Sequence, residues 1–336
     1  MAERRLGIGF VGAGFNARFH FQALQGVRDA DVLGVWDPDR SRAADAAALA
    51  RRLDVGHATP YASITEMVDD PAIDAIWLTA PNFARLENVE EITSAVQRGR
   101  ATLAGIACEK PLGRNVAEAT QVVELVKRAG LKHGYLENQL FAPQVERGRT
   151  ILWARGAALT GRPYLARAAE EHAGPHSPWF WRGNLQGGGV LNDMMCHSAL
   201  VVRHLLTKPG EPLSTVKPVR VTGHIASLKW SRPAYAKRLS QSMGPEVDYT
   251  KQASEDFARV VIEFETGARA DGTLVARKAR LVLDKGAYCG EGGFFAQMAA
   301  MHALGPYELE NVHVGASLVY SNNQPSGSIR APTAPQ

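Results

Sequence analysis

The stretch Leu6-Gly-Ile-Gly-Phe-Val-Gly-Ala-Gly-Phe-Asn-Ala17 decides the fold of the first part of the chain. Its first six residues form the apolar run of a buried strand, and the rest follows the pattern Gly-x-Gly-x-x-Ala. Gly12 permits a tight turn, Gly14 lets a phosphate approach the backbone, and Ala17 lets the next helix pack closely. A strand that leads through this turn into a helix predicts a dinucleotide site, with the pyrophosphate at the helix N-terminus.

An acidic residue ends the second expected strand. Asp37 follows the glycines by about 20 residues, where a carboxylate can accept hydrogen bonds from ribose hydroxyls. Its charge would repel a 2′-phosphate, so the sequence favours NAD over NADP. Arg40 and Arg42 could receive that phosphate, which leaves NADP open. The alternative is a glycine-rich turn in a similar fold that binds no nucleotide.

Strand-like runs alternate with helical stretches through the first part of the chain. The strands are expected at residues 6–11, 31–36, 75–79 and 103–107, and the helices at residues 18–25, 40–53, 63–71, 86–97 and 115–126. This alternation predicts an α/β fold, a doubly wound parallel sheet in a Rossmann domain over residues 1–134.

Beyond residue 134 the pattern becomes that of an α+β domain over residues 135–270. Helices are expected at residues 144–153 and 192–206, and strands at residues 164–168, 219–227 and 257–264. The second helix follows the chain break Gly187-Gly188-Gly189.

Bulk composition excludes several classes of protein. The chain has 336 residues, 45% of them hydrophobic and 21% charged, as in a globular protein of two or three domains. The net charge of +4 comes from scattered Lys and Arg, so no nucleic-acid partner is expected. Cys108, Cys196 and Cys289 are far apart, which suits a reducing compartment. No apolar run reaches membrane-span length, so we expect a cytoplasmic protein without a membrane partner.

Lys110 lies in Cys108-Glu109-Lys110-Pro111, directly after an expected strand. The proline ring restricts Lys110 to an extended or turn conformation. Ligands bind at the carboxyl ends of strands in open α/β sheets, which makes Lys110 a candidate site residue. A surface lysine before a turn is the alternative.

Asp193 and His197 are four positions apart on the helix expected at residues 192–206, so they would share one face. A carboxylate beside an imidazole fixes its tautomer and raises its basicity, as a general base requires. A surface pair at the start of a helix is the alternative. His172 and His176 could complete a metal site with them, but the spacing matches no metal motif, so no metal is expected.

Together the glycine turn, the Glu-Lys-Pro turn and the Asp193/His197 pair resemble the Gfo/Idh/MocA family (glucose–fructose oxidoreductase / inositol dehydrogenase) over about residues 5–268. The resemblance implies an NAD(P)-dependent oxidoreductase that acts on a sugar, polyol or related hydroxylated substrate. In that family Lys110 would hydrogen-bond the reacting hydroxyl, His197 would take its proton, and Asp193 would orient or assist His197. The hydride would pass to nicotinamide C4.

The resemblance also implies details around this chemistry. Family members often have a cis bond at the position of Lys110–Pro111, so a cis bond is expected here. Ala80-Pro81-Asn82 would form the loop near the nicotinamide. Family members commonly pair through the second-domain sheet, so a homo-oligomer is expected. Arg85 departs from the histidine that the family commonly has there, which puts local cofactor or substrate contacts in doubt.

Two sets of binding residues follow. The expected cofactor contacts are Gly12, Gly14, Phe15, Asn16, Ala17, Asp37, Arg40, Ala80, Pro81, Asn82, Glu109 and Lys110. The expected substrate contacts, in an aromatic, His-rich loop, are His172, His176, Trp179, Trp181 and Arg182. Tryptophan faces pack against sugar C–H surfaces, while His and Arg bind hydroxyls or carboxylates; a merely packed aromatic loop is the alternative.

The tail over residues 271–336 has a different likeness. Blocks such as Leu283-Asp284-Lys285-Gly286-Ala287-Tyr288 resemble the molybdenum-cofactor-binding large subunit of the xanthine dehydrogenase / aldehyde oxidase family. The join would fall at residues 267–271 and leave the second-domain sheet incomplete, with an open edge onto which part of the tail could pair. No functional molybdopterin site is expected, because a fragment lacks most of the cofactor's shell.

The likeness of the tail leaves other interpretations open. It could be a divergent end of the oxidoreductase sheet, or the product of a natural fusion, a chimera or a misassembled gene. Two functional alternatives remain as well: a nucleotide-binding protein without turnover, regulatory or inactivated by the tail, and a molybdenum hydroxylase fragment.

Overall fold

The computed structural model describes residues 5–99, 101–171, 174, 177–251, 254–265 and 279–283. The chain divides into two compact units. The first comprises Met1–Glu137, Pro175–Asp193 and Ala236–Ser254, and the second comprises Asn138–Gly174, Met194–Tyr235 and Glu255–Gln336. The first unit therefore contains two segments that lie, in sequence, inside the expected second domain.

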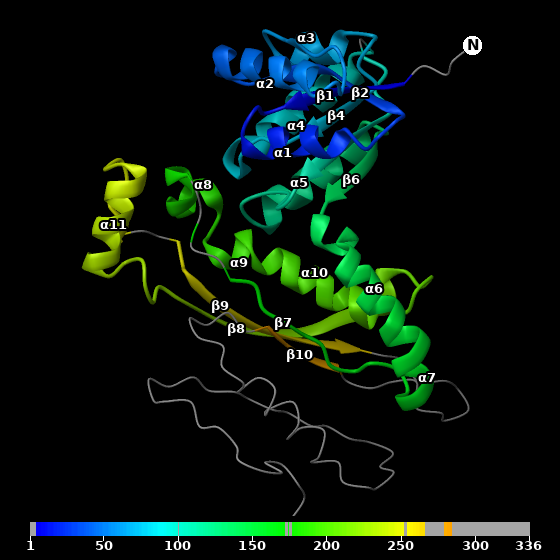
Figure 1. Ribbon diagram of the computed structural model, residues 1–336, viewed down its shortest axis with the longest axis vertical. Coiled ribbons are helices and arrows are strands. Elements are labelled where there is room, and N and C mark those ends of the chain that lie inside the picture. The colour runs from blue at the N-terminus through cyan, green and yellow to red at the C-terminus, as the bar shows by residue number, and fades with distance from the viewer. Residues whose placement is uncertain are drawn as a thin grey trace, which may run out of the picture. The chain divides into compact units, whose positions relative to one another are not determined.

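The first unit is built on a six-stranded sheet with the order β3-β2-β1-β4-β5-β6 (Figure 1). Its strands are β1 (Leu6–Val11), β2 (Ala30–Trp36), β3 (Thr59–Pro60), β4 (Ala75–Leu78), β5 (Gly105–Glu109) and β6 (Lys132–Leu136). Every neighbouring pair is parallel. The strand order reverses between β1 and β4, as in a doubly wound Rossmann sheet, so the predicted fold is confirmed.

Helices connect these strands. They are α1 (Phe15–Leu24), α2 (Arg40–Arg52), α3 (Ile64–Asp69), α4 (Asn82–Gln97) and α5 (Val116–Arg128). Side-chain caps fix three of the starts: Asp39 Oδ1 accepts from Ser41 N, Ser63 Oγ from Glu66 N, and Asn115 Oδ1 from Glu118 N, each at 3.0 Å. Helix α4 begins at Asn82, earlier than the expected residue 86.

Two apolar clusters make up the core of the first unit. One contains residues of β4, β5 and helices α3 to α5, and the other contains residues of β1, β2, α1 and α2. Phe10 is central to the second cluster, with 0% of its surface exposed. Its ring meets Phe21 edge-on at 4.8 Å and stacks on Trp77 at 5.5 Å. This packing ties the glycine turn after β1 to a rigid strand.

The second unit contains a four-stranded sheet with the order β7-β10-β9-β8. Its strands are β7 (Arg167–Ala168), β8 (Lys217–Ala226), β9 (Phe257–Glu265) and β10 (Ala279–Leu283). β9 is antiparallel to both of its neighbours, and β10 is parallel to β7. Helix α10 (Met195–Leu206) contacts β7 and β10 and runs along the sheet in Figure 1.

β10 comes from the tail expected to begin at residue 271. The expectation that part of the tail pairs onto the sheet is confirmed, although β10 lies between β9 and β7 rather than at an edge. The rest of the tail, residues 271–278 and 284–336, lies outside the described residues.

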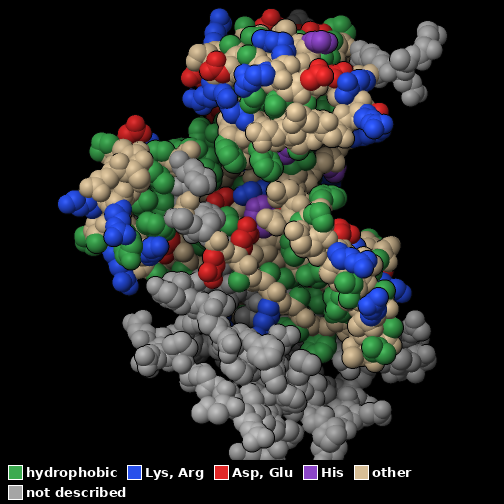
Figure 2. All heavy atoms as spheres, in the orientation of Figure 1, with side chains coloured by type: hydrophobic (Ala, Val, Ile, Leu, Met, Phe, Trp, Pro, Cys, Tyr) green, Lys and Arg blue, Asp and Glu red, His purple; other side chains and the backbone are tan. Residues whose placement is uncertain are grey.

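Shorter elements complete the described chain. They are the 3-10 turns Asn138–Phe141, Pro178–Trp181, Leu213–Thr215 and Tyr249–Lys251, the helices α6 (Pro143–Ile151), α7 (Ala157–Thr160), α8 (Gly183–Gln186), α9 (Val190–Asp193) and α11 (Pro233–Met243), and the π-helical turn Leu152–Gly156. None of the helices in the described ranges is long and apolar enough to cross a membrane. On the face shown in Figure 2, acidic and basic side chains of the first unit are intermixed.

Replacing the central core ring should destabilise the first unit strongly. Phe10→Ala removes both ring contacts and leaves a cavity, so we expect it to lower the free energy of unfolding by about 3–5 kcal/mol. Val27→Ala, at a position 44% exposed, is the control and should change it by less than about 0.5 kcal/mol. Urea unfolding of both variants measures the difference, and equal midpoints would contradict this account of the core.

Candidate active site

The turn after β1 is held closely against the end of β4. Gly12 has φ +99°, and a Cβ there would lie 2.8 Å from Ala80 N, so only glycine fits. Thr79 Oγ1 donates to Gly12 O at 2.8 Å, and Gly12 N donates to Trp36 O at 2.8 Å. Ala17 is fully buried beneath the turn. These contacts bring the fingerprint and the Ala80-Pro81-Asn82 loop to one end of the sheet.

The N-terminus of α1 is open to an anion. No described atom lies within 4 Å of a Cβ built on Gly14. Among the described residues no side chain caps α1, and its first turn contains no acidic residue. Phe15 and Asn16 are exposed. Helix N-terminal N–H groups without a side-chain partner bind phosphates, so this end of α1 fits the pyrophosphate of a dinucleotide.

Asp37 is buried at the end of β2, with 6% of its surface exposed. Its Oδ2 accepts from Ala13 N at 2.9 Å, and its Oδ1 accepts from Asp39 N at 3.0 Å. Asp37 therefore positions the glycine turn in addition to the ribose role expected from the sequence.

A second carboxylate stands next to Asp37. Asp39 caps α2 and accepts from Ser41 N and Arg42 N. A hydrogen bond from the Ser41 hydroxyl, followed by the Arg42 N–H, holds the pKa of Asp39 below its usual value. Arg42 lies 3.9 Å from Asp37 Oδ1 and 3.5 Å from Asp39 Oδ2. Arg40 is exposed at the first position of α2.

Lys110 follows β5 directly, and the Lys110–Pro111 bond is cis, as the resemblance implies. Its Nζ donates to Asp193 O at 2.8 Å and to Asp193 Oδ1 at 2.9 Å. The two side chains are 17% and 18% exposed. The structure thus brings together two of the three expected catalytic residues as a partly buried ion pair.

The helix expected at residues 192–206 is broken, and this expectation was wrong. Helix α9 ends at Asp193 and α10 begins at Met195. In a continuous helix Asp193 O would accept from His197 N. Instead Asp193 O accepts from Lys110 Nζ, and His197 N donates to Met194 O at 3.1 Å. Asp193 and His197 therefore do not share one face of a single helix, and His197 is buried in the first turn of α10.

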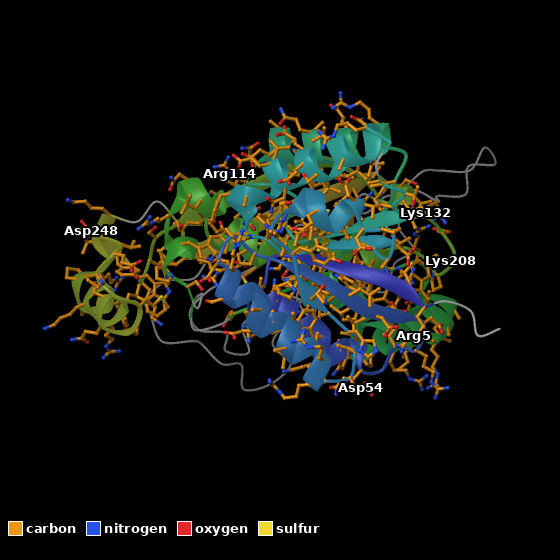
Figure 3. All side chains as sticks on the ribbon, turned by 90° about the horizontal axis from the view of Figure 1, so that it is seen from above. Arg5, Asp54, Arg114, Lys132, Lys208 and Asp248 are labelled. Carbon is orange, nitrogen blue, oxygen red and sulfur yellow. The ribbon has the colours of Figure 1, made fainter. Side chains whose placement is uncertain are left out.

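The segment that carries Asp193 is fastened to the first unit at two further points. Gln186 O accepts from Asn82 Nδ2 at 2.8 Å, and Arg114 Nη1 donates to Asn184 O at 2.9 Å. Gly187 has φ +92°, and a Cβ there would lie 2.3 Å from Arg114 O. Figure 3 shows Arg114 between this segment and the helices of the first unit.

Arg114 is itself fixed by Glu118, one turn into α5. Arg114 Nε donates to Glu118 Oε1 at 2.9 Å, and Arg114 N donates to Glu118 Oε2 at 2.8 Å. Burial raises the pKa of Glu118, but the hydrogen bonds and charge of Arg114 outweigh it and hold the pKa below its usual value. The carboxylate therefore stays ionised and keeps the guanidinium directed at the 184–187 segment.

Arg85 occupies the interior behind the Ala80-Pro81-Asn82 loop, with 2% of its surface exposed. Its Nη2 donates to Ala80 O at 2.7 Å, while Nε and Nη1 have no hydrogen-bond partner among the described residues. Burial lowers the pKa of the guanidinium, and Cys108, Glu109 and Tyr135 act in the opposite direction. The residue that departs from the family pattern thus supports the loop from within.

The aromatic loop divides into exposed and buried parts. Trp179 is half-buried, stacks on Phe180 at 3.9 Å and meets Phe83 edge-on at 5.9 Å. Trp181, also expected to bind substrate, is only 3% exposed and donates from Nε1 to Met243 Sδ at 3.3 Å. Its ring is a packing element, so that expectation is corrected.

The other expected substrate residues have different surroundings. Arg182 is exposed and donates to Glu246 O at 3.2 Å. His172 and His176 lie outside the described residues.

The sequence reasoning missed His20. His20 Nε2 lies 2.6 Å from Glu109 Oε1, and Glu109 Oε2 accepts from Lys110 N at 3.1 Å. The available signal was helical periodicity, because Ala17, Phe21 and Leu24 form the buried face of α1 and His20 lies next to it.

Three family models match the chain. Residues 6–135 match an oxidoreductase family with an NAD-binding Rossmann fold, and residues 157–280 match the GFO/IDH/MocA C-terminal domain. Residues 231–336 match a molybdopterin cofactor-binding domain. The last two matches overlap at residues 231–280, and the join expected at residues 267–271 lies inside that overlap.

The chain is similar both to a molybdopterin-binding subunit and to sugar oxidoreductases. The chain is 31% identical over 150 residues to the nicotinate dehydrogenase large molybdopterin subunit of Eubacterium barkeri, covering 45% of this chain and 28% of the relative. It is 29% identical over 155 residues to the 1,5-anhydro-D-fructose reductase of Ensifer adhaerens, covering 45% of this chain and 44% of the relative. It is 27% identical over 292 residues to the D-apiose dehydrogenase of Paraburkholderia graminis, covering 80% of this chain and 71% of the relative. The chain thus spans less than half the length of the first two.

Among solved structures, GenD2 from gentamicin A biosynthesis, in complex with NAD, is similar with a TM-score of 0.62 and 23% identity. The match covers 86% of this chain and 68% of that chain. At this identity the likeness supports the fold.

Filling the space at Gly187 should loosen the segment that carries Asp193. Gly187→Ala combines a disfavoured φ with a backbone clash, whereas Gly130→Ala has φ +68° and no described atom within 4 Å of the new Cβ. We expect Gly130→Ala to destabilise the protein by about 1 kcal/mol and Gly187→Ala by at least about 2 kcal/mol. Chemical unfolding of the two variants gives the comparison, and equal losses would mean that Arg114 does not hold this segment.

Proposed function

Because residues 6–135 and 157–280 belong to the GFO/IDH/MocA oxidoreductase family, we propose that this protein is an NAD(P)-dependent dehydrogenase for a sugar, polyol or related hydroxylated substrate. The observation that supports it most is the Lys110–Asp193 pair at the carboxyl end of β5. In an α/β sheet of this kind ligands bind at that end. The same end carries the open N-terminus of α1, where the dinucleotide would bind.

Lys110, Asp193 and His197 would have different roles in the oxidation of an alcohol. Lys110 would donate a hydrogen bond to the reacting hydroxyl, and its positive charge favours the developing alkoxide. Asp193 holds the ammonium through two oxygens and so fixes its direction. His197 would accept the hydroxyl proton as general base. NAD, when bound, supplies the hydride acceptor, and the reverse direction uses the same groups.

The substrate class is supported by the relatives and by one aromatic surface. Two of the relatives are named for a sugar, 1,5-anhydro-D-fructose reductase and D-apiose dehydrogenase. Trp179 and Phe83 form an edge-on aromatic pair, and Phe83 directly follows the Asn82 loop. Such rings pack against the C–H face of a sugar, so we propose that this pair forms one wall of the substrate site.

The molybdopterin match raises a second candidate, a molybdenum hydroxylase fragment. The match covers 28% of the nicotinate dehydrogenase subunit, whereas the oxidoreductase models match residues 6–135 and 157–280 of this chain. We propose that the protein holds no molybdenum. Metal analysis of the purified protein tests this, and stoichiometric molybdenum would reverse the assignment.

Removing the Lys110 ammonium should abolish turnover without removing the cofactor site. For Lys110→Ala we expect kcat to fall at least about a hundred-fold on any sugar or polyol that the wild type oxidises, because the alkoxide loses its charge partner. NADH affinity, measured by fluorescence, should stay within a few-fold. Lys132→Ala, on the exposed edge strand β6, is the control and should behave as wild type.

Each outcome of this experiment has a defined meaning. Intact turnover in Lys110→Ala would overturn the proposed chemistry. NADH binding without oxidation of any member of a broad polyol and sugar-acid panel would instead favour a nucleotide-binding protein without turnover.

The two carboxylates after β2 should make the protein prefer NADH to NADPH. Asp39→Ser keeps a helix-capping side chain but removes one negative charge near the expected ribose site. We expect it to raise NADPH affinity about three- to ten-fold and leave NADH affinity unchanged, because a 2′-phosphate is less repelled. Titration of both nucleotides by fluorescence checks this, and a wild type that prefers NADPH would contradict it.

A further inference from the structure

His20, in helix α1, is linked through Glu109 to the turn Glu109-Lys110-Pro111 at the end of β5. His20 Nε2 lies 2.6 Å from Glu109 Oε1, and the two side chains are 18% and 9% exposed. The ring of His20 packs at 5.1 Å from Trp77 and at 6.4 Å from Phe10. Because these rings restrict its orientation, His20 presents Nε2 to the carboxylate in a fixed direction.

Glu109 passes this constraint to Lys110. Its other oxygen, Oε2, accepts from the backbone N–H of Lys110 at 3.1 Å. One carboxylate therefore joins α1 to the peptide that carries the Lys110 side chain. Two hydrogen bonds to opposite oxygens fix both the position and the rotation of a carboxylate.

Arg85, the other cation near Glu109, directs its hydrogen bond elsewhere. The charges of Arg85 and Glu109 interact, but Arg85 Nη2 donates its hydrogen bond to Ala80 O at 2.7 Å. A carboxyl group that is 7% exposed needs hydrogen-bonded partners to offset the loss of water around it. His20 supplies such a partner from helix α1.

We propose that His20 is a positioning residue which, through Glu109, fixes the backbone of Lys110 and thereby directs its ammonium at Asp193. The proposal rests on the function proposed above, in which Lys110 binds the reacting hydroxyl. It also links two halves of that site, because His20 lies in the helix whose N-terminus would receive the cofactor pyrophosphate.

The chemical reactivity of Lys110 tests the link without any substrate. In the full-length protein, acetylation by a water-soluble acetyl ester is followed by mass spectrometry of the peptide that contains Lys110. In the wild type, the contacts with Asp193 should make Lys110 react slowly. In His20→Ala we expect it to react at least about three-fold faster, because the turn is no longer held and the ammonium leaves Asp193 more often.

Internal and matched controls separate this effect from unfolding. The exposed Lys132 and Lys208, labelled in Figure 3, should react at unchanged rates. His57→Gln, at an exposed histidine, should leave all three rates unchanged. Wild-type reactivity of Lys110 in His20→Ala would overturn the proposal, as would equal acceleration at all three lysines.

A second variant covers the case in which His20→Ala does not fold. Glu109→Gln keeps the shape of the side chain but weakens both hydrogen bonds, and it should accelerate Lys110 acetylation to a similar degree. The double variant His20→Ala/Glu109→Gln should add less than about two-fold to either single change, because both act through one chain of contacts. Multiplicative effects of the two changes would show that His20 and Glu109 act separately.

An activity measurement distinguishes this proposal from the function on which it rests. On a substrate that the wild type oxidises, His20→Ala should lower kcat by about ten-fold or more, with the KM for NAD within two-fold. His20→Gln, which retains a donor, should recover part of the loss. Unchanged kcat in His20→Ala would refute the positioning role. A wild type that oxidises no substrate would instead refute the proposed function, and the acetylation rates would then test the link between His20 and Lys110 by themselves.

Discussion

The hydrogen bonds from the Lys110 ammonium to the backbone and side chain of Asp193 are the contact on which the arrangement of the site depends. A partly buried ammonium needs acceptors, and Asp193 provides two from one residue. Lys110 binds the Asp193 carbonyl at the residue where α9 ends, and α10 begins two residues later. The same contact, with those of Asn82 and Arg114, explains why residues 175–193 belong to the first compact unit.

The fold of the first unit could be predicted because its signals are local. A buried apolar strand, a glycine turn and helix caps such as Asn115 act within a few residues of each other. Elements without a local signal were missed. β6 (Lys132–Leu136) is an edge strand without an apolar run, and α11 (Pro233–Met243) combines a polar surface with few buried residues. Their formation depends on pairing and packing with distant segments.

The candidate site shows the same division. Gly12, Lys110 and Asp193 could be identified from their neighbours in sequence and from the family resemblance. The break at Met194, the burial of Trp181 and the interior position of Arg85 each depend on a contact with a segment far away in the chain. The contact between His20 and Glu109 joins residues 89 positions apart, and no spacing rule connects them.

Strand β10 pairs with β9 and β7 through its backbone. A β-ladder is formed by peptide N–H and C=O groups, which every residue except proline possesses, so it recognises an extended chain rather than a particular ancestry. Residues 231–336 match a molybdopterin-binding domain, yet five of them complete a sheet in a domain matched to a different family. The backbone pairing of β10 therefore places no requirement on the family to which its sequence is similar.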